Sequence, residues 1–211
     1  MEWLNNNAQA ISAVTSILTL LVWLFYAQLL YNGYVRQRRP RIIINRGLGT
    51  GQNALCLISN MSSESIYIQH VVAILHTQEN SYMVDVAEYQ EEKEDEQKGK
   101  SIRSHQGPLA SGDYLHMQRF ADIADQICTT WRLDNAIYDQ TGLQLELRVI
   151  AIYGSEDRPV GASRTFYLSD PSTSEKALIP ISVDTKRLNG RLQRRKVKRW
   201  AEEVDNLETK R

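Results

Sequence analysis

The chain has 211 residues, and its 25 Lys and Arg balance 25 Asp and Glu, so its formal net charge is zero. This balance argues against general nucleic-acid binding, and we expect no nucleic-acid partner. The two cysteines, Cys56 and Cys128, lie far apart in the sequence, which argues against a zinc site or a redox pair. We therefore expect both to be buried, and to be reduced if the domain is cytoplasmic.

An apolar segment near the start of the chain, Ile11 to Leu30, contains no charged residue. A helix of this length spans about 30 Å, the thickness of the hydrocarbon core of a bilayer. A cleavable signal peptide would have basic residues before the apolar stretch and small residues at a cleavage site, and this segment has neither. We therefore predict an uncleaved transmembrane helix over residues 11–34, preceded by a short N-terminal segment, residues 1–10.

Four arginines follow this segment, while no basic residue precedes it. Lys and Arg close to a span are retained on the cytoplasmic side of the membrane. The asymmetry predicts a single-pass protein of the inner (plasma) membrane, with its N-terminus outside and its C-terminal domain in the cytoplasm. Pro40 disfavours a helix that continues from the span, so residues 35–41 are predicted to be a basic linker. The four arginines are Arg36, Arg38, Arg39 and Arg41.

Residues 42–185 are rich in β-branched and aromatic residues, with turn signals between short runs. This pattern predicts one domain, an antiparallel β-sandwich. The clearest strand is 143–154, where apolar residues alternate, and we expect it to pair with 162–169. Residues 120–131 interrupt the strands, because Ile123, Ile127 and Trp131 recur at helical spacing and predict one short internal helix. Further strands are expected at 41–45, 53–59, 65–76, 81–89 and 113–120.

The stretch IIINRG…ALCLISNMSSESIYIQHVVAIL, within residues 42–75, has a first strand that ends in Asn-x-Gly and a second that ends in a polar turn. It resembles the opening strands of many bacterial immunoglobulin-like modules. This resemblance implies an immunoglobulin-like sandwich. The stretch has no diagnostic tryptophan or cysteine pair, so the resemblance implies an architecture and no family.

Few residues in the domain suggest chemistry. The loop GLGTG, Gly47–Gly51, lacks the last glycine of a dinucleotide fingerprint and precedes a strand, so we predict a hairpin turn. His70 and His76 lie about 20 Å apart along one strand, too far to share a metal. The acidic stretch Glu88–Lys100 is predicted to be a solvated loop or hairpin tip. We therefore predict no enzyme, no catalytic residues, no cofactor, no metal and no small-molecule substrate, although a catalytic pair assembled from distant residues stays open.

Two segments suggest binding surfaces. In the span, Ser12, Thr15, Ser16 and Thr19 fall on one helix face, where they either contact another helix or bond their own backbone carbonyls. Residues 186–211 predict a basic amphipathic C-terminal helix, whose apolar residues lie nearly opposite its basic ones. This helix either docks on its own domain, pairs with the acidic residues 91–96, or binds anionic lipid or a protein partner. The predicted binding residues are Arg194, Arg195, Lys198, Arg199 and Trp200, together with Arg36, Arg38, Arg39 and Arg41.

These features predict a membrane-anchored cytoplasmic binding or scaffold module, which holds a protein partner or a second copy of itself at the membrane. An alternative is an accessory subunit of a larger membrane complex that docks through the polar face of its span. A third is an enzyme of unrecognised type, which a deep pocket lined by convergent carboxylates or histidines would favour.

Overall fold

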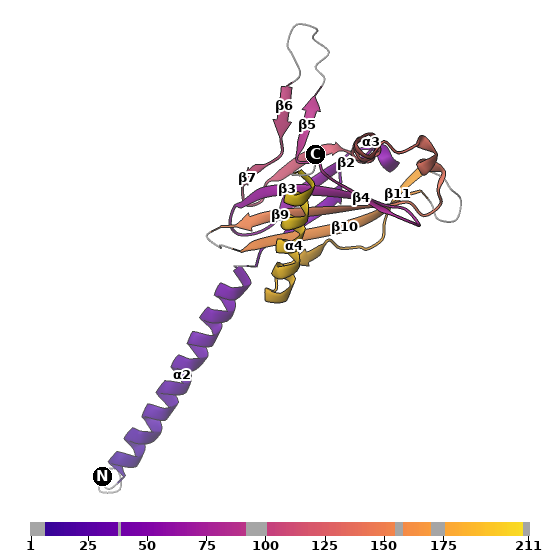
Figure 1. Cartoon of the computed structure of the whole chain (residues 1–211). Coiled ribbons are helices and arrows are strands. Elements are labelled where there is room, and N and C mark those ends of the chain that lie inside the picture. The colour runs from indigo at the N-terminus through magenta and orange to yellow at the C-terminus, as the bar shows by residue number, and fades with distance from the viewer. Residues whose placement is uncertain (1–6, 38, 92–100, 155–157, 170–175, 209–211) are drawn as a thin grey trace. The chain divides into compact units, whose positions relative to one another are not determined.

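The structure is a computed structural model that describes residues 7–37, 39–91, 101–154, 158–169 and 176–208. It divides into two compact units, residues 1–39 and residues 40–211 (Figure 1).

The first unit is the helix α2 (Ala8–Gln37). Its segment Ala8–Val35 is long and apolar enough to cross a membrane by length and composition, criteria that a signal sequence near an N-terminus also meets. The predicted span, 11–34, lies within this helix. The helix also includes the first residues of the predicted linker, since none of them breaks a helix, and it ends before Pro40 as expected.

The second unit contains two antiparallel sheets and a separate hairpin (Figure 1). The large sheet has the strand order β11-β10-β9-β3-β4, with β12 beside β10 and β7 beside β3. The small sheet has the order β1-β2-β8, and β5 pairs with β6. The strands are β1 (Ile42–Arg46), β2 (Leu55–Asn60), β3 (Ile66–His76), β4 (Ser81–Asp85), β5 (Glu88–Glu91), β6 (Ser101–Ser104), β7 (Gly107–Leu109), β8 (Tyr114–Arg119), β9 (Gln144–Tyr153), β10 (Pro159–Ser169), β11 (Lys176–Pro180) and β12 (Lys186–Leu188).

The helices of this unit make it a mixed α/β domain. They are α3 (Phe120–Trp131) and α4 (Arg191–Glu208), with short 3₁₀ turns at η1 (Gly51–Asn53) and η2 (Asn135–Asp139). The sheets do not close, and the strand order does not show the immunoglobulin-like topology that the sequence predicted. The predicted pairing of the two long strands is confirmed, because β9 and β10 run antiparallel with Val149 opposite Ala162.

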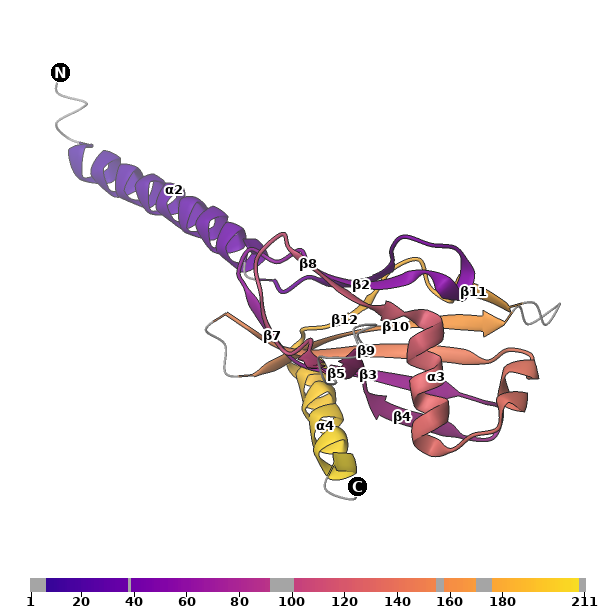
Figure 2. The same cartoon turned by 90° about the horizontal axis from the view of Figure 1, so that it is seen from above.

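The elements form layers around the large sheet (Figure 2). The small sheet and α3 cover one face and enclose the main core with it, where the rings of Phe120 and Phe166 lie 4.8 Å apart. Helix α4 covers part of the other face, where Val197, Trp200 and Val204 form a second, smaller core with residues of β3, β9 and β12. The predicted internal helix, residues 120–131, is confirmed as α3.

Several local predictions can be compared with this fold. The loop Gly47–Gly51 joins β1 and β2, and both Gly49 and Gly51 have positive φ, as expected for a hairpin turn. Cys56 and Cys128 are buried free thiols, and burial raises the pKa of Cys56 to about 12. The acidic stretch begins in the β5–β6 hairpin, and its residues 92–100 lie outside the described residues. In the C-terminal segment predicted as helical, residues 186–211, the helix α4 begins at Arg191, after Gly190, and residues 186–188 form β12.

Candidate functional site

The start of α4 is fixed beside the residue at which the chain joins the domain. The side-chain amide of Asn189 donates a hydrogen bond to the Pro40 carbonyl at 3.4 Å, and Arg194 Nε donates to the Asn189 carbonyl at 2.8 Å. Gly190 caps the helix, since its carbonyl accepts from the Arg194 N–H and its own N–H donates to Gln193 Oε1. The N-terminal end of α4 therefore lies at Pro40.

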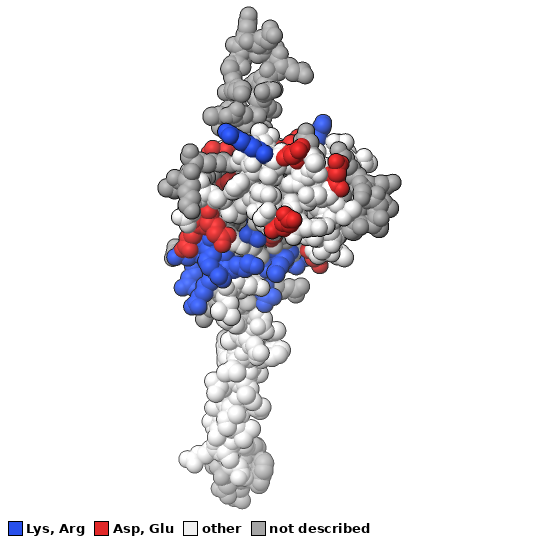
Figure 3. Space-filling model, turned by 45° about the vertical axis from the view of Figure 1, so that its right-hand side comes forward, with Lys and Arg blue, Asp and Glu red and all other residues white. Residues whose placement is uncertain are grey.

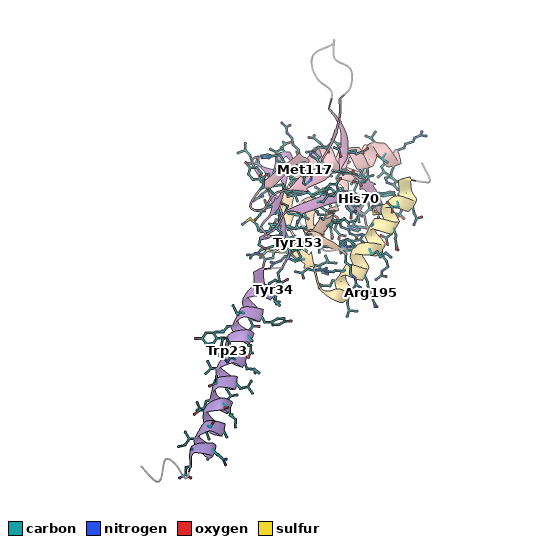
Figure 4. All side chains as sticks on the ribbon, turned by 90° about the vertical axis from the view of Figure 1, so that its left-hand side faces the viewer. Trp23, Tyr34, His70, Met117, Tyr153 and Arg195 are labelled. Atoms are coloured by element: carbon teal, nitrogen blue, oxygen red, sulfur yellow. The ribbon has the colours of Figure 1, made fainter. Side chains whose placement is uncertain are left out.

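The first half of α4 exposes a dense group of basic side chains. Arg195, Lys198 and Arg199 are exposed, and Arg194 is partly buried. Figure 3 shows Lys and Arg gathered on one part of the domain surface, and Figure 4 shows Arg195 on the side of α4 turned away from the sheets. Lys198 approaches Glu202 at 3.7 Å, but both side chains are mostly exposed, so this pair contributes little to stability. The exposed side chains of Arg195, Lys198 and Arg199 thus remain accessible from solvent.

The order of charges along α4 is opposite to the order that stabilises a helix. The first turn holds no acidic residue and the last turn holds no basic residue. Basic side chains lie near the positive end of the helix dipole and acidic ones near its negative end, and each such placement is unfavourable. Stability of the helix therefore does not account for this arrangement.

Trp200 corrects one of the sequence predictions. It was predicted to contact lipid or a partner, but its side chain is only 4% exposed and packs against the large sheet. The Arg148 guanidinium lies 4.6 Å from the centre of its ring, at cation–π distance. Because Val197 and Val204 are buried on the same face, the alternative that the structure supports is a helix docked on its own domain with its basic face exposed. Trp200 holds α4 to the sheet and offers no surface to a partner.

The other predicted binding residues lie in different parts of the chain. Arg36 belongs to α2, Arg39 is exposed, and Arg38 lies outside the described residues. Arg41 is also exposed, and its N–H donates to Ser62 Oγ at 2.7 Å at the start of β1. Of the basic residues predicted near the span, Arg41 is therefore the one that the structure places in the domain together with α4.

The hydroxyl groups of the predicted α2 face bond mainly to their own helix. Thr15 Oγ1 donates to the Ile11 carbonyl, Ser16 Oγ to the Ser12 carbonyl and Thr19 Oγ1 to the Thr15 carbonyl, at 2.8–2.9 Å. This is the local bonding that the sequence left as one of two alternatives. With Leu20 and Trp23, the four predicted residues line a shallow hollow on one side of the helix. Any contact at this face would depend on close packing more than on hydrogen bonds between helices.

A polar network on the large sheet was not predicted. His76 lies between a hydroxyl and a carboxylate, with Nδ1 2.8 Å from Ser81 Oγ and Nε2 3.2 Å from Glu146 Oε2. Arg148 donates to both Glu146 oxygens at 2.9 Å. Burial by itself would raise the pKa of Glu146, but the hydrogen bonds and charges of His76 and Arg148 lower it to about 2.

This network has the residue types of a hydrolytic triad but a different arrangement of partners. In such triads the carboxylate orients the histidine, whereas here Glu146 is engaged on both oxygens by Arg148, which lies under Trp200. We therefore assign the network to docking of α4. His70 pairs separately with Asp85 at 2.7 Å, so the two histidines share no ligand, and the described residues contain no cluster that could hold a metal ion.

The surface that combines the most of the predicted site residues is therefore the basic face of α4 beside Pro40 and Arg41. This surface lies beside Pro40, the residue at which the chain enters the domain. The order of charges along α4 does not stabilise the helix itself. Comparisons of this chain with protein families, with curated proteins and with solved structures found no match.

Proposed function

We propose that this protein is a membrane-anchored binding module, in which α2 is the anchor and the basic face of α4 holds the domain against anionic lipid headgroups. The observation that carries the proposal is the contact of Asn189 with Pro40, which puts the basic start of α4 next to the point where the chain joins the domain. The module would use this position to hold a protein partner, or a second copy of itself, at the membrane surface.

Covalent connection limits how far this surface can move from the anchor. Residues 35–39 separate the end of the predicted span from Pro40. Even fully extended, a segment of this length covers only about 20 Å. If α2 spans the bilayer, the start of α4 stays within that distance of the membrane surface, whatever the orientation of the domain.

The sign of the charge agrees with the expected side of the membrane. Arg36, Arg38, Arg39 and Arg41 predict that the domain lies in the cytoplasm. The cytoplasmic leaflet is the anionic one, and each basic residue near its surface contributes about 1 kcal/mol, less at higher salt. The exposed residues Arg195, Lys198 and Arg199 would therefore contribute about 3 kcal/mol at low salt.

Vesicle binding by the domain alone tests this proposal. Residues 40–211 contain both hydrophobic cores, so this part can be studied without the span. We expect it to co-sediment with vesicles of phosphatidylcholine and phosphatidylserine at low salt, and much less with phosphatidylcholine alone. The double change Arg195→Glu and Arg199→Glu should abolish this difference.

A matched control separates this surface from net charge. Arg119→Glu with Arg132→Glu changes the net charge by the same amount, but these exposed residues flank α3 on the other side of the large sheet. The control pair should retain most of the binding. Equal loss in both pairs, or equal binding to neutral and anionic vesicles, would contradict the proposal.

A second candidate function is docking of α2 onto another membrane-spanning helix, as in an accessory subunit of a larger complex. The shallow hollow lined by the small residues of α2 favours it, because small side chains let two helix backbones approach closely. Replacing Ser12 and Ser16 by Leu should weaken crosslinking between spans in membranes. An unchanged crosslinking pattern would leave only the local hydrogen bonds as their role.

A further inference from the structure

Three aliphatic side chains are exposed in the segment that precedes α4 and in the first turn of α4. Ile181 is 46% exposed and Val183 is 92% exposed, and in the first turns of α4 Leu192 is 79% exposed. Aliphatic residues of this size are buried in most of the domain. The exposure of these three side chains is unfavourable in water, because each leaves apolar surface in contact with solvent.

Hydrogen bonds hold this segment in place. The buried Arg164 donates from Nη2 to the Val183 carbonyl at 3.0 Å and from Nη1 to the Ile44 carbonyl at 2.8 Å. Thr185 Oγ1 accepts from the Ile44 N–H and bonds to the Ile44 carbonyl, both at 3.0 Å. The Ile181 N–H donates to the Thr165 carbonyl. Val183 is therefore exposed on an ordered, hydrogen-bonded loop.

The segment runs beside β1 toward the start of α4. Thr185 contacts Ile44, and four residues later Asn189 contacts Pro40, so the two stretches run antiparallel. Val183 lies beyond Thr185 in the direction away from Pro40. The exposed aliphatic residues and the basic face of α4 are thus parts of one continuous stretch of chain, residues 181–199, which passes the point where the domain is tethered.

The charged residues exposed on residues 181–192 and on the neighbouring stretch, residues 41–46, are mostly positive. The exposed basic residues on these two stretches are Arg41, Arg46, Lys186 and Arg187. The acidic residue beside them in the sequence is Asp184. Basic side chains around exposed aliphatic ones are typical of surfaces that lie in the interface of an anionic bilayer. Leu192 lies in the first turn of α4, whose start contacts Pro40, so this part of the surface stays close to the tether.

We propose that Val183 and Leu192 insert into the headgroup and acyl boundary of an anionic bilayer. This inference rests on the proposed function, and it adds a second, hydrophobic contact to the electrostatic one. Charge would bring the surface to the membrane, and insertion of the two side chains would make the attachment less sensitive to salt.

Labelled cysteines in the full chain test the insertion directly. The full chain in nanodiscs of phosphatidylcholine and phosphatidylserine would carry an environment-sensitive fluorophore on Val183→Cys or Leu192→Cys, with Asp122→Cys on α3 as the matched control. The native cysteines are both buried and so react little with the label. We expect a blue shift and quenching by lipids with a quencher near the headgroup at residues 183 and 192, and neither effect at residue 122.

Salt dependence separates this inference from the proposed function. At about 0.5 M salt, where charges are screened, the double change Val183→Ser and Leu192→Ser should reduce vesicle binding of residues 40–211 by about tenfold or more. Binding that needs anionic lipid but shows the same signal at residues 183 and 122 would overturn insertion and leave the electrostatic contact. Absence of any anionic-lipid dependence would overturn both.

Discussion

Replacing Gly161 by Ala tests whether α4 docks on the large sheet through a close contact with β10. A Cβ atom at this position would lie 2.7 Å from Val197 Cγ2 and 3.2 Å from the Val149 carbonyl oxygen. A distance of 2.7 Å is shorter than carbon atoms tolerate, so the helix would have to move. Overpacking of this kind destabilises proteins by about 1–3 kcal/mol, and we expect Gly161→Ala to lower the free energy of unfolding by an amount in that range.

A second substitution tests whether the loss of stability comes from the contact between residue 161 and Val197. Val197→Ala removes both methyl groups that the new Cβ would meet, at a cost of about 2 kcal/mol from lost burial and the remaining cavity. In the double variant the Cβ at residue 161 has room, so the total loss should be smaller than the sum of the single losses by about 1 kcal/mol or more.

Urea unfolding of residues 40–211 measures these differences, with the fluorescence of Trp131 and the buried Trp200 reporting on unfolding. As a control, Gly161→Ala combined with Val84→Ala should be additive within about 0.5 kcal/mol, because Val84 belongs to the main core on the other face of the sheet. If the pair of Gly161 and Val197 is equally additive, the docked position of α4 is wrong.

Three further predictions concern the network, the β1–β2 turn and the topology. The pKa of Glu146 is lowered from 4.5 to about 2, so its ionised form adds at most about 3 kcal/mol to the free energy of unfolding above pH 4.5, and this contribution is lost as the pH falls toward 2. Glu146→Gln should remove that part of the acid-unfolding curve, and an unchanged curve would refute the network. Gly49→Ala should lower the urea midpoint, since φ is +114° and a Cβ would lie 2.8 Å from the backbone of residues 53–54; an unaltered midpoint would mean that the turn relaxes freely. A reporter fused after Arg211 should be active only in the cytoplasm, and activity outside would reverse the predicted topology.

The elements that the sequence predicted well have strong local patterns. Apolar alternation along β9 and helical spacing in α3 each determine which face is buried, and both elements appear where they were expected. The strand β12 was not predicted, since it lies within the segment assigned to the C-terminal helix and three residues carry too little periodicity to indicate a strand. Its strand conformation depends on pairing with β10, far away in the sequence, and on burial of Leu188 in the second core.

The candidate site was predictable only in part for the same reason. The opposite apolar and basic faces of the C-terminal helix were visible in its spacing. The network around His76 was not, because it needs the register that puts Ser81 across from His76 and brings Glu146 within reach on the next strand. The exposure of Val183 likewise depends on Arg164 from a different strand.

The apolar and basic residues of α4 lie on opposite faces of the helix, and this arrangement favours binding through a helix that is docked on its own domain. A free amphipathic helix lies in a bilayer with its apolar face down, so basic residues on the opposite face would point away from lipid. Once Val197, Trp200 and Val204 are buried in the domain, the opposite face is the one left in solvent, and the proposed function assigns it the contact with the membrane. The apolar contact then has to come from elsewhere, and Val183 and Leu192 are exposed on the same stretch of chain. In the proposed arrangement the domain core holds the helix, the basic face of the helix supplies attraction, and Val183 in the loop and Leu192 in the first turn of α4 supply insertion.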